Sequence, residues 1–189
     1  MIEATNRVIL VTGPSRSGKS EWAEQLAARS GQLVVYVATA QLDAHDSEWQ
    51  ARIEQHQVRR PAAWVTLTIP VDLAATIAAA TADQCLLVDS LGTWLANCLE
   101  QDETVWAQTR QDLLSSLQNS AGQVILVAEE AGWGVVPAYP LGRRFRDRLG
   151  SLVRQIGVMA HPVYLVTAGH VLNLSSLGQP FLGNSADLP

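Results

Sequence analysis

Lysine is almost missing from this sequence. Lys19 is the single lysine among 13 cationic residues, and the others are arginines. A function that needs a compact ammonium group, rather than the forked guanidinium of arginine, can therefore fall only at position 19.

Excess positive charge is lacking as well. The 189 residues carry a formal net charge of −5, and only 16% of them are charged. Nucleic-acid binders gain much of their affinity by neutralising phosphates with clustered lysine and arginine. We therefore expect no nucleic-acid partner, although a local pocket for a phosphorylated small molecule remains compatible with this composition.

Long apolar runs and cysteines are also few. The longest apolar runs, such as Leu33–Ala38, fall far short of the roughly 20 residues that a membrane helix needs. The polar first residues do not look like a signal peptide. Cys85 and Cys98 are too few for a disulfide framework and lie in apolar surroundings. We expect a cytoplasmic protein with no membrane span, whose two thiols lie reduced in the core.

Short apolar runs alternate with longer stretches of helical period, which is typical of a parallel sheet covered by helices. We predict strands at Arg7–Thr12, Leu33–Thr39, Gln84–Asp89, Val124–Glu129 and Val163–Ala168. We predict helices at Lys19–Arg29, Ser47–Arg59, Asp72–Ala80, Leu91–Glu100, Thr104–Ser120 and Leu141–Met159. The length fits a single domain over residues 1–189.

Two stretches break this alternation. Residues 130–140 contain two glycines and two prolines, which predicts a loop. From about residue 170 to 189 the chain is rich in glycine, serine and asparagine, so we predict an irregular C-terminal tail there.

The pattern G-x-x-x-x-G-K-[ST] lies between the first predicted strand and the first predicted helix. Its residues are Gly13, Pro14, Ser15, Arg16, Ser17, Gly18, Lys19 and Ser20. The two glycines allow a tight turn whose N–H groups face a phosphate at the positive end of the helix. Lys19 is then placed to reach the β- and γ-phosphates, and the Ser20 hydroxyl to ligate Mg²⁺. The pattern predicts nucleotide binding without specifying the reaction.

Acidic residues end two other predicted strands. Asp89 closes one strand and suits a role in holding Mg²⁺, directly or through water. It could instead cap the helix that follows, although Ser90 could serve there too. Glu129 and Glu130 end a later strand at the same expected edge of the sheet. The residues alone leave open whether these two glutamates belong to the site.

One of the four histidines differs from the rest. His45, His161 and His170 adjoin turns or strand ends, which favours solvated or structural roles. His56 lies near the end of a charged predicted helix, with several arginines close by in sequence. Neighbouring positive charge would keep its imidazole neutral and hence nucleophilic. Spacing alone does not distinguish a nucleophilic His56 from a histidine that takes no part in the chemistry.

Six stretches together resemble the bifunctional adenosylcobinamide kinase / adenosylcobinamide-phosphate guanylyltransferase family of cobalamin assembly. They are VILVTGPSRSGKSEWAE, VVYVATA, ARIEQHQVRRPAAW, LLVDSLGTWLAN, EEAGWGVVP and GRRFRDRLG, in the family's order from about Val8 to Gly169. The predicted fold class is accordingly α/β, a P-loop (RecA-like) single domain with a mostly parallel sheet flanked by helices.

The resemblance implies two reactions. A nucleoside triphosphate, ATP or GTP, phosphorylates adenosylcobinamide, and GTP then guanylylates His56, which passes GMP to adenosylcobinamide phosphate. The resemblance makes His56 and Lys19 catalytic, and implies a homotrimer with active sites between subunits. Further nucleotide contacts carried over by motif are Ala38, Thr39, Ala40, Gln57, Val58, Arg59, Arg60 and Asp89.

The chain departs from the family pattern at three places. Thr68 stands where a glutamate is common, Glu129 replaces the asparagine of N-E-V-G, and Val153-Arg154 replaces an Asn-Gln pair. These changes bear on guanine recognition and corrinoid binding, and leave the phosphate loop and His56 intact.

Two other functions compete with this hypothesis. A P-loop small-molecule kinase would transfer a γ-phosphate without forming a nucleotidyl-enzyme. A nucleotide-binding module without chemistry would bind GTP without turnover.

The loop around Trp133 and the arginines after it could line a corrinoid site or pack on a neighbouring subunit.

Overall fold

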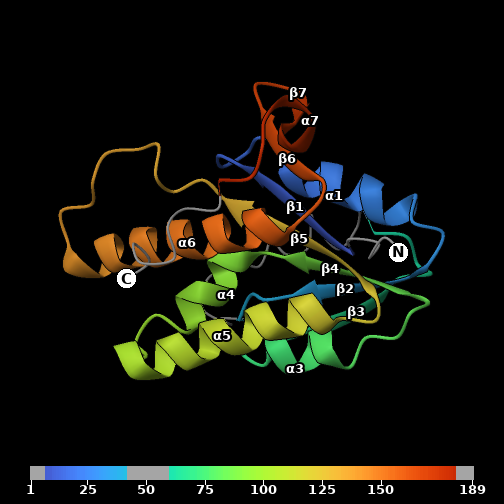
Figure 1. Cartoon of the computed structure of the whole chain (residues 1–189), viewed down its shortest axis with the longest axis horizontal. Coiled ribbons are helices and arrows are strands. Elements are labelled where there is room, and N and C mark those ends of the chain that lie inside the picture. Colours follow the sequence, from blue (N-terminus) through green and yellow to red (C-terminus); the bar gives the residue numbers. More distant parts are fainter. Residues whose placement is uncertain (1–6, 42–59, 182–189) are drawn as a thin grey trace.

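A computed structural model describes residues 7–41 and 60–181 (Figure 1). Seven strands in these ranges form one sheet in the order β3-β2-β4-β5-β1-β6-β7. The strands are β1 Val8–Gly13, β2 Leu33–Ala38, β3 Val65–Thr68, β4 Gln84–Asp89, β5 Gln123–Glu129, β6 Val163–Thr167 and β7 His170–Asn173. All neighbouring pairs are parallel except β6 and β7. The predicted class, a single α/β domain with a mostly parallel sheet, is confirmed.

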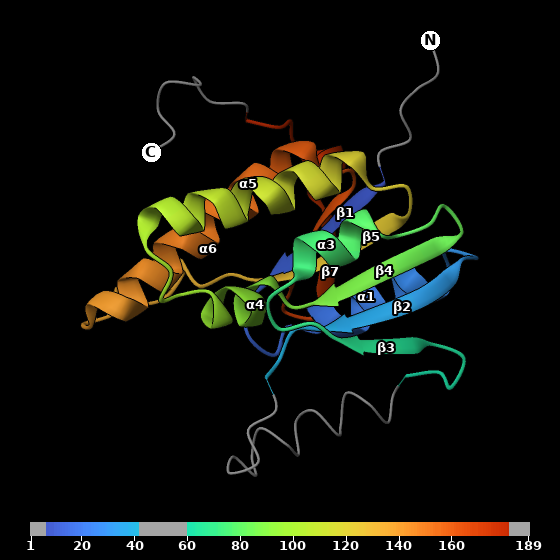
Figure 2. The ribbon, with the colours of Figure 1, turned by 90° about the horizontal axis from the view of Figure 1, so that it is seen from below.

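Helices cover both faces of this sheet. They are α1 Lys19–Ala28, α3 Leu73–Ala78, α4 Leu91–Asn97, α5 Glu103–Asn119, α6 Pro140–Met159 and α7 Leu174–Leu177. Helices α3 to α6 lie on one face, and α1 lies on the other (Figure 2). The predicted helix Ser47–Arg59 lies outside the described residues. No helix in the described ranges is both long and apolar enough to cross a membrane.

The central strands are hydrophobic on both faces because helices pack against both. Residues 124–128 of β5 are all buried, and so are residues 85–88 of β4. Alternate residues of each strand enter two separate hydrophobic clusters, one under α3 to α6 and one under α1. Two-sided burial explains why these strands read as continuous apolar runs rather than alternating patterns.

The prediction of an irregular tail from residue 170 is wrong for residues 170–177, which form β7 and α7. Thr167 pairs with His170, so Ala168 and Gly169 make a two-residue hairpin loop. Both have positive φ, 49° and 74°, as a type I′ turn requires. Ala-Gly is a weaker hairpin signal than Asn-Gly, and the composition of this stretch concealed the strand.

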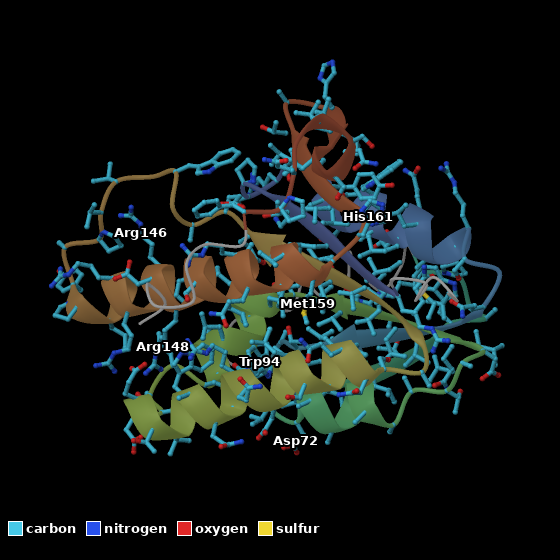
Figure 3. All side chains as sticks on the ribbon, viewed as in Figure 1. Asp72, Trp94, Arg146, Arg148, Met159 and His161 are labelled. Carbon is cyan, nitrogen blue, oxygen red and sulfur yellow. The ribbon has the colours of Figure 1, made fainter. Side chains whose placement is uncertain are left out.

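Arg148 of α6 contacts α5 and the loop that precedes α5, within the layer formed by α3 to α6 (Figure 3). Its side chain is buried, and its guanidinium donates to the carbonyls of Leu99 and Gln101 at 3.3 and 3.0 Å. It also lies 5.0 Å from the ring centroid of Trp106 on α5. The ion pair with Glu103 adds little, because that carboxylate is 83% exposed.

Arg148→Ala should therefore lower the free energy of unfolding by about 1–3 kcal/mol, because it leaves buried carbonyls without donors. Urea unfolding measures this change. Arg154→Ala removes an exposed arginine of the same helix and should stay within about 0.5 kcal/mol of wild type. Equal unfolding midpoints for the two variants would contradict the role given to Arg148.

Candidate nucleotide-binding site

The register of the sheet brings four strand ends to one edge. Gly13 of β1 is level with Glu129 of β5, and Asp89 of β4 is level with both Val127 of β5 and Ala38 of β2. Because β5 lies between β1 and β4, the phosphate loop and Asp89 stand two strand spacings apart, roughly 10 Å. The predicted acidic residues and the phosphate loop therefore meet at the same edge.

The phosphate loop is closely packed at its start. A Cβ on Gly13 would overlap the carbonyl oxygen of Val166 on β6 and lie 2.8 Å from Ser17 Oγ. Gly18 has φ +91° and occupies the N-cap of α1, a left-handed conformation that glycine adopts without strain. The loop thus has the tight turn and helix N-terminus that the sequence pattern predicts.

Lys19 is held inside this loop. It is only 8% exposed, and its Nζ donates to the carbonyl of Pro14 at 3.3 Å. An ammonium has three N–H donors, so one contact with the loop leaves donor capacity for phosphate oxygens. The single lysine of the chain is therefore a buried cation at the first turn of α1.

Ser90, rather than Asp89, caps helix α4. Its Oγ accepts from the backbone N–H of Thr93 at 3.3 Å. Its backbone N–H donates to Thr39 Oγ1 at 2.9 Å, and the Thr39 hydroxyl donates back to the Ser90 carbonyl at 2.8 Å. Thr39 is fully buried. Asp89 is therefore not the cap of α4, because its neighbour Ser90 has that role.

Glu129 closes the gap between β5 and the start of α4. Its Oε1 accepts from Ser90 Oγ at 2.5 Å, and its Oε2 accepts from the backbone N–H of Gly92 at 3.0 Å. A Cβ on Gly92 would overlap this carboxylate, which explains the glycine. Both oxygens of Glu129 are thus engaged at the α4 terminus.

Glu130 instead faces the phosphate-loop strand. Its Oε1 accepts from Thr12 Oγ1 at 2.7 Å, and its backbone N–H donates to the carbonyl of Gly13 at 3.0 Å. The two glutamates, which the sequence could not tell apart, therefore bond to different elements, and Glu130 lies directly beside the loop.

Asp89 has a partner that the sequence analysis missed. The hydroxyl of Tyr36 on β2 donates to Asp89 Oδ2 at 2.9 Å, and the guanidinium of Arg60 lies 3.4 Å from the centroid of the Tyr36 ring. Sequence reasoning treated Tyr36 as an apolar strand residue. The one sequence feature that could have pointed to Tyr36 is its position in VVYVA, two residues before the end of a strand that pairs with the strand of Asp89.

The donor set at this edge suits a hard cation. The Ser20 hydroxyl on α1 and the Asp89 carboxylate on β4 are oxygen donors of the kind that Mg²⁺ prefers together with phosphate oxygens and water. Within residues 7–41 and 60–181, no group of three or more His, Cys, Asp or Glu side chains is placed to hold a metal. A metal here would therefore depend on the bound nucleotide for ligands.

The remaining predicted site residues divide into two sets. Arg60 and the phosphate loop lie on the described edge, with Ala38 and Ala40 half-buried at the end of β2. His56, Gln57, Val58 and Arg59 lie outside the described residues. Trp133 is 60% exposed in the loop before α6, and Arg143 donates to that loop's own carbonyls at Pro137 and Ala138.

Comparison with known proteins identifies the family. Residues 9–174 match the model of cobinamide kinase / cobinamide phosphate guanyltransferase. The bifunctional adenosylcobalamin biosynthesis protein CobP of Pseudomonas aeruginosa is 45% identical over 173 residues, which is 90% of this chain and 98% of that protein. The CobU protein of Salmonella typhimurium is 37% identical over 86% of this chain and 96% of its own length.

The chain belongs to this family. The resemblance drawn from six sequence stretches is confirmed, and with it an enzyme of the cobinamide kinase and guanylyltransferase kind. A solved Pyrococcus horikoshii OT3 structure also superposes with a TM-score of 0.54 at 6% identity, over 89% of this chain and 86% of that one. At such low identity this match supports the fold alone.

The phosphate loop of this chain has little room at Gly13. Gly13→Ala should weaken GTP binding and lower the unfolding free energy by about 1–3 kcal/mol, because the added methyl meets backbone that cannot yield easily. Calorimetric titration with GTP and urea unfolding measure the two effects. Gly134→Ala is the control, since its Cβ meets nothing within 4 Å. Wild-type GTP affinity in Gly13→Ala would refute this description of the loop.

Proposed function

We propose that this enzyme phosphorylates adenosylcobinamide and then guanylylates the product through His56. Its membership of the cobinamide kinase / cobinamide phosphate guanyltransferase family supports both activities. The observation that carries the nucleotide chemistry is the common edge of β1, β5 and β4, with buried Lys19 at one side and Asp89 at the other.

In the first reaction, the substrate hydroxyl oxygen attacks the γ-phosphorus of a nucleoside triphosphate, and the hydroxyl proton passes to solvent. The bond from that phosphorus to the bridging oxygen breaks, and the nucleoside diphosphate leaves. Lys19 and the loop N–H groups stabilise the charge on the phosphates. Mg²⁺, held by Ser20 and Asp89 with the nucleotide, would neutralise the β- and γ-oxygens. We propose that either ATP or GTP can serve as donor.

In the second reaction, a ring nitrogen of His56 attacks the α-phosphorus of GTP, and the bond to pyrophosphate breaks. A phosphate oxygen of adenosylcobinamide phosphate then attacks the phosphorus of the GMP group, which releases the histidine and gives adenosyl-GDP-cobinamide. Covalent catalysis of this kind divides one difficult transfer into two displacements. Arg16 and either Arg59 or Arg60 are the cations proposed to assist Lys19.

We also propose a homotrimer, as the resemblance implies, and a cytoplasmic location, as the composition predicts. The loop before α6 supports a role in assembly or corrinoid binding, because Val135 is 94% and Tyr139 80% exposed.

Both cysteines are buried, and burial raises the pKa of the Cys85 thiol to about 11. A protonated thiol of this kind reacts slowly with oxidants.

The decisive test of the nucleophile is labelling with α-labelled GTP. Wild type should form an acid-labile, alkali-stable adduct that His56→Ala lacks, while γ-phosphate transfer to adenosylcobinamide persists in this variant. His170→Ala, which removes an exposed histidine on β7, should label as wild type does. Label retained in His56→Ala would exclude the assignment. Kinase turnover without any adduct in wild type would favour the plain kinase, and GTP binding without turnover the non-catalytic module.

Lys19→Arg should slow both reactions despite keeping the charge. The buried pocket holds a compact ammonium, and a planar guanidinium cannot take the same place between Pro14 and the phosphates. Loss of a well-placed donor costs about 100-fold or more in kcat, which initial rates of each reaction measure. Arg29→Lys alters an exposed cation just after α1 and should leave both rates unchanged. Near-normal rates in Lys19→Arg would count against the phosphate cradle.

A further inference from the structure

The hydrogen bond between Tyr36 and Asp89 joins two neighbouring strands on the face covered by α1. Tyr36 is level with Leu87 of β4, so Asp89 lies two residues further along. Side chains two residues apart point to the same face of a strand. The tyrosine ring therefore extends along the sheet surface, and its hydroxyl reaches the carboxylate at the strand end, 2.9 Å from Oδ2.

Tyr36 is built to donate this hydrogen bond and not to ionise. Its side chain is 2% exposed. A tyrosine hydroxyl keeps its proton at neutral pH, since its ordinary pKa is about 10. A hydroxyl that donates to a carboxylate forms a charge-assisted bond, which is stronger than a bond between neutral groups.

Arg60 stacks on a face of the Tyr36 ring. Its guanidinium carbon lies 3.4 Å from the ring centroid of Tyr36, as in a cation–π stack. Its Nε is buried and has no hydrogen-bond partner among the described residues. The ring is thus packed between the sheet and a cation.

We infer that Tyr36 is a positioning residue for the metal–nucleotide site, which holds the Asp89 carboxylate in one orientation while Arg60 fixes the ring. This inference rests on the proposed role of Asp89 toward Mg²⁺. A phenylalanine would fill nearly the same volume, so packing alone does not explain a buried hydroxyl at this position. Hydrogen bonds to carboxylate ligands orient them, and their loss typically lowers metal affinity about 10- to 100-fold.

The test compares GTP binding with Mg²⁺ and with EDTA, by calorimetry, in Tyr36→Phe, Asp89→Asn and the double variant. Tyr36→Phe should reduce the Mg²⁺-dependent gain in affinity about 10-fold and leave binding in EDTA unchanged. In the Asp89→Asn background, Tyr36→Phe should add no more than about a twofold change, because coupled residues act through one another. Tyr164→Phe, a half-buried tyrosine on β6 whose ring meets Trp22 edge-on, is the matched control and should behave as wild type.

The outcomes separate the inference from the proposed function. If Asp89→Asn abolishes the Mg²⁺-dependent gain but Tyr36→Phe keeps it, the positioning role is wrong and the metal assignment stands. If Asp89→Asn keeps the gain, the metal assignment and the inference both fail. Equal loss of affinity with Mg²⁺ and with EDTA in Tyr36→Phe would mark a merely structural role and overturn the inference.

Discussion

The site depends on the register of the parallel strands β2, β4, β5 and β1. Each strand is buried on both faces, so a slip of one residue would exchange its two sets of apolar side chains between different hydrophobic clusters. The same slip would turn Asp89 away from Tyr36 and Thr12 away from Glu130. Core packing and the placement of polar groups are therefore fixed by one set of backbone hydrogen bonds.

Polar residues at this edge divide into those that build the edge and those that face the loop or the proposed metal. Ser90, Thr39 and Glu129 bond to one another or to the start of α4. Buried polar groups are costly without partners, and this small network satisfies them locally. Because Ser90 caps the helix, the carboxylate of Asp89 has no capping role and instead accepts from the Tyr36 hydroxyl. Glu129, where the resemblance led us to expect an asparagine, lies within this supporting network and not in the phosphate loop.

The sequence was informative where a single local signal determines structure. Glycines and the lone lysine located the phosphate loop, and burial on both faces made β1, β2, β4 and β5 recognisable as apolar runs. The strand β6 is also an apolar run, although Val166 is its one buried residue. β3 was missed because its four exposed residues at the sheet edge carry little hydrophobic signal. Tyr36 could not be assigned, because its role arises from a diagonal neighbour 53 residues away that only the register brings close. Glu129 and Glu130 were likewise separable only through their partners.

The contacts of the arginines give a physical reason for the scarcity of lysine. Arg60 stacks on Tyr36, Arg148 on Trp106 and Arg29 on Trp22, with carbon-to-centroid distances of 3.4, 5.0 and 5.9 Å. A planar guanidinium suits these faces, and it bonds several carbonyls at once, as Arg148 does. The phosphate loop imposes the opposite requirement, because the enclosed space beside Pro14 admits a compact charge on a flexible stem. Under the proposed function, an acidic protein binds a polyanionic nucleotide without a basic surface because its one ammonium, on Lys19, is buried beside the phosphate loop.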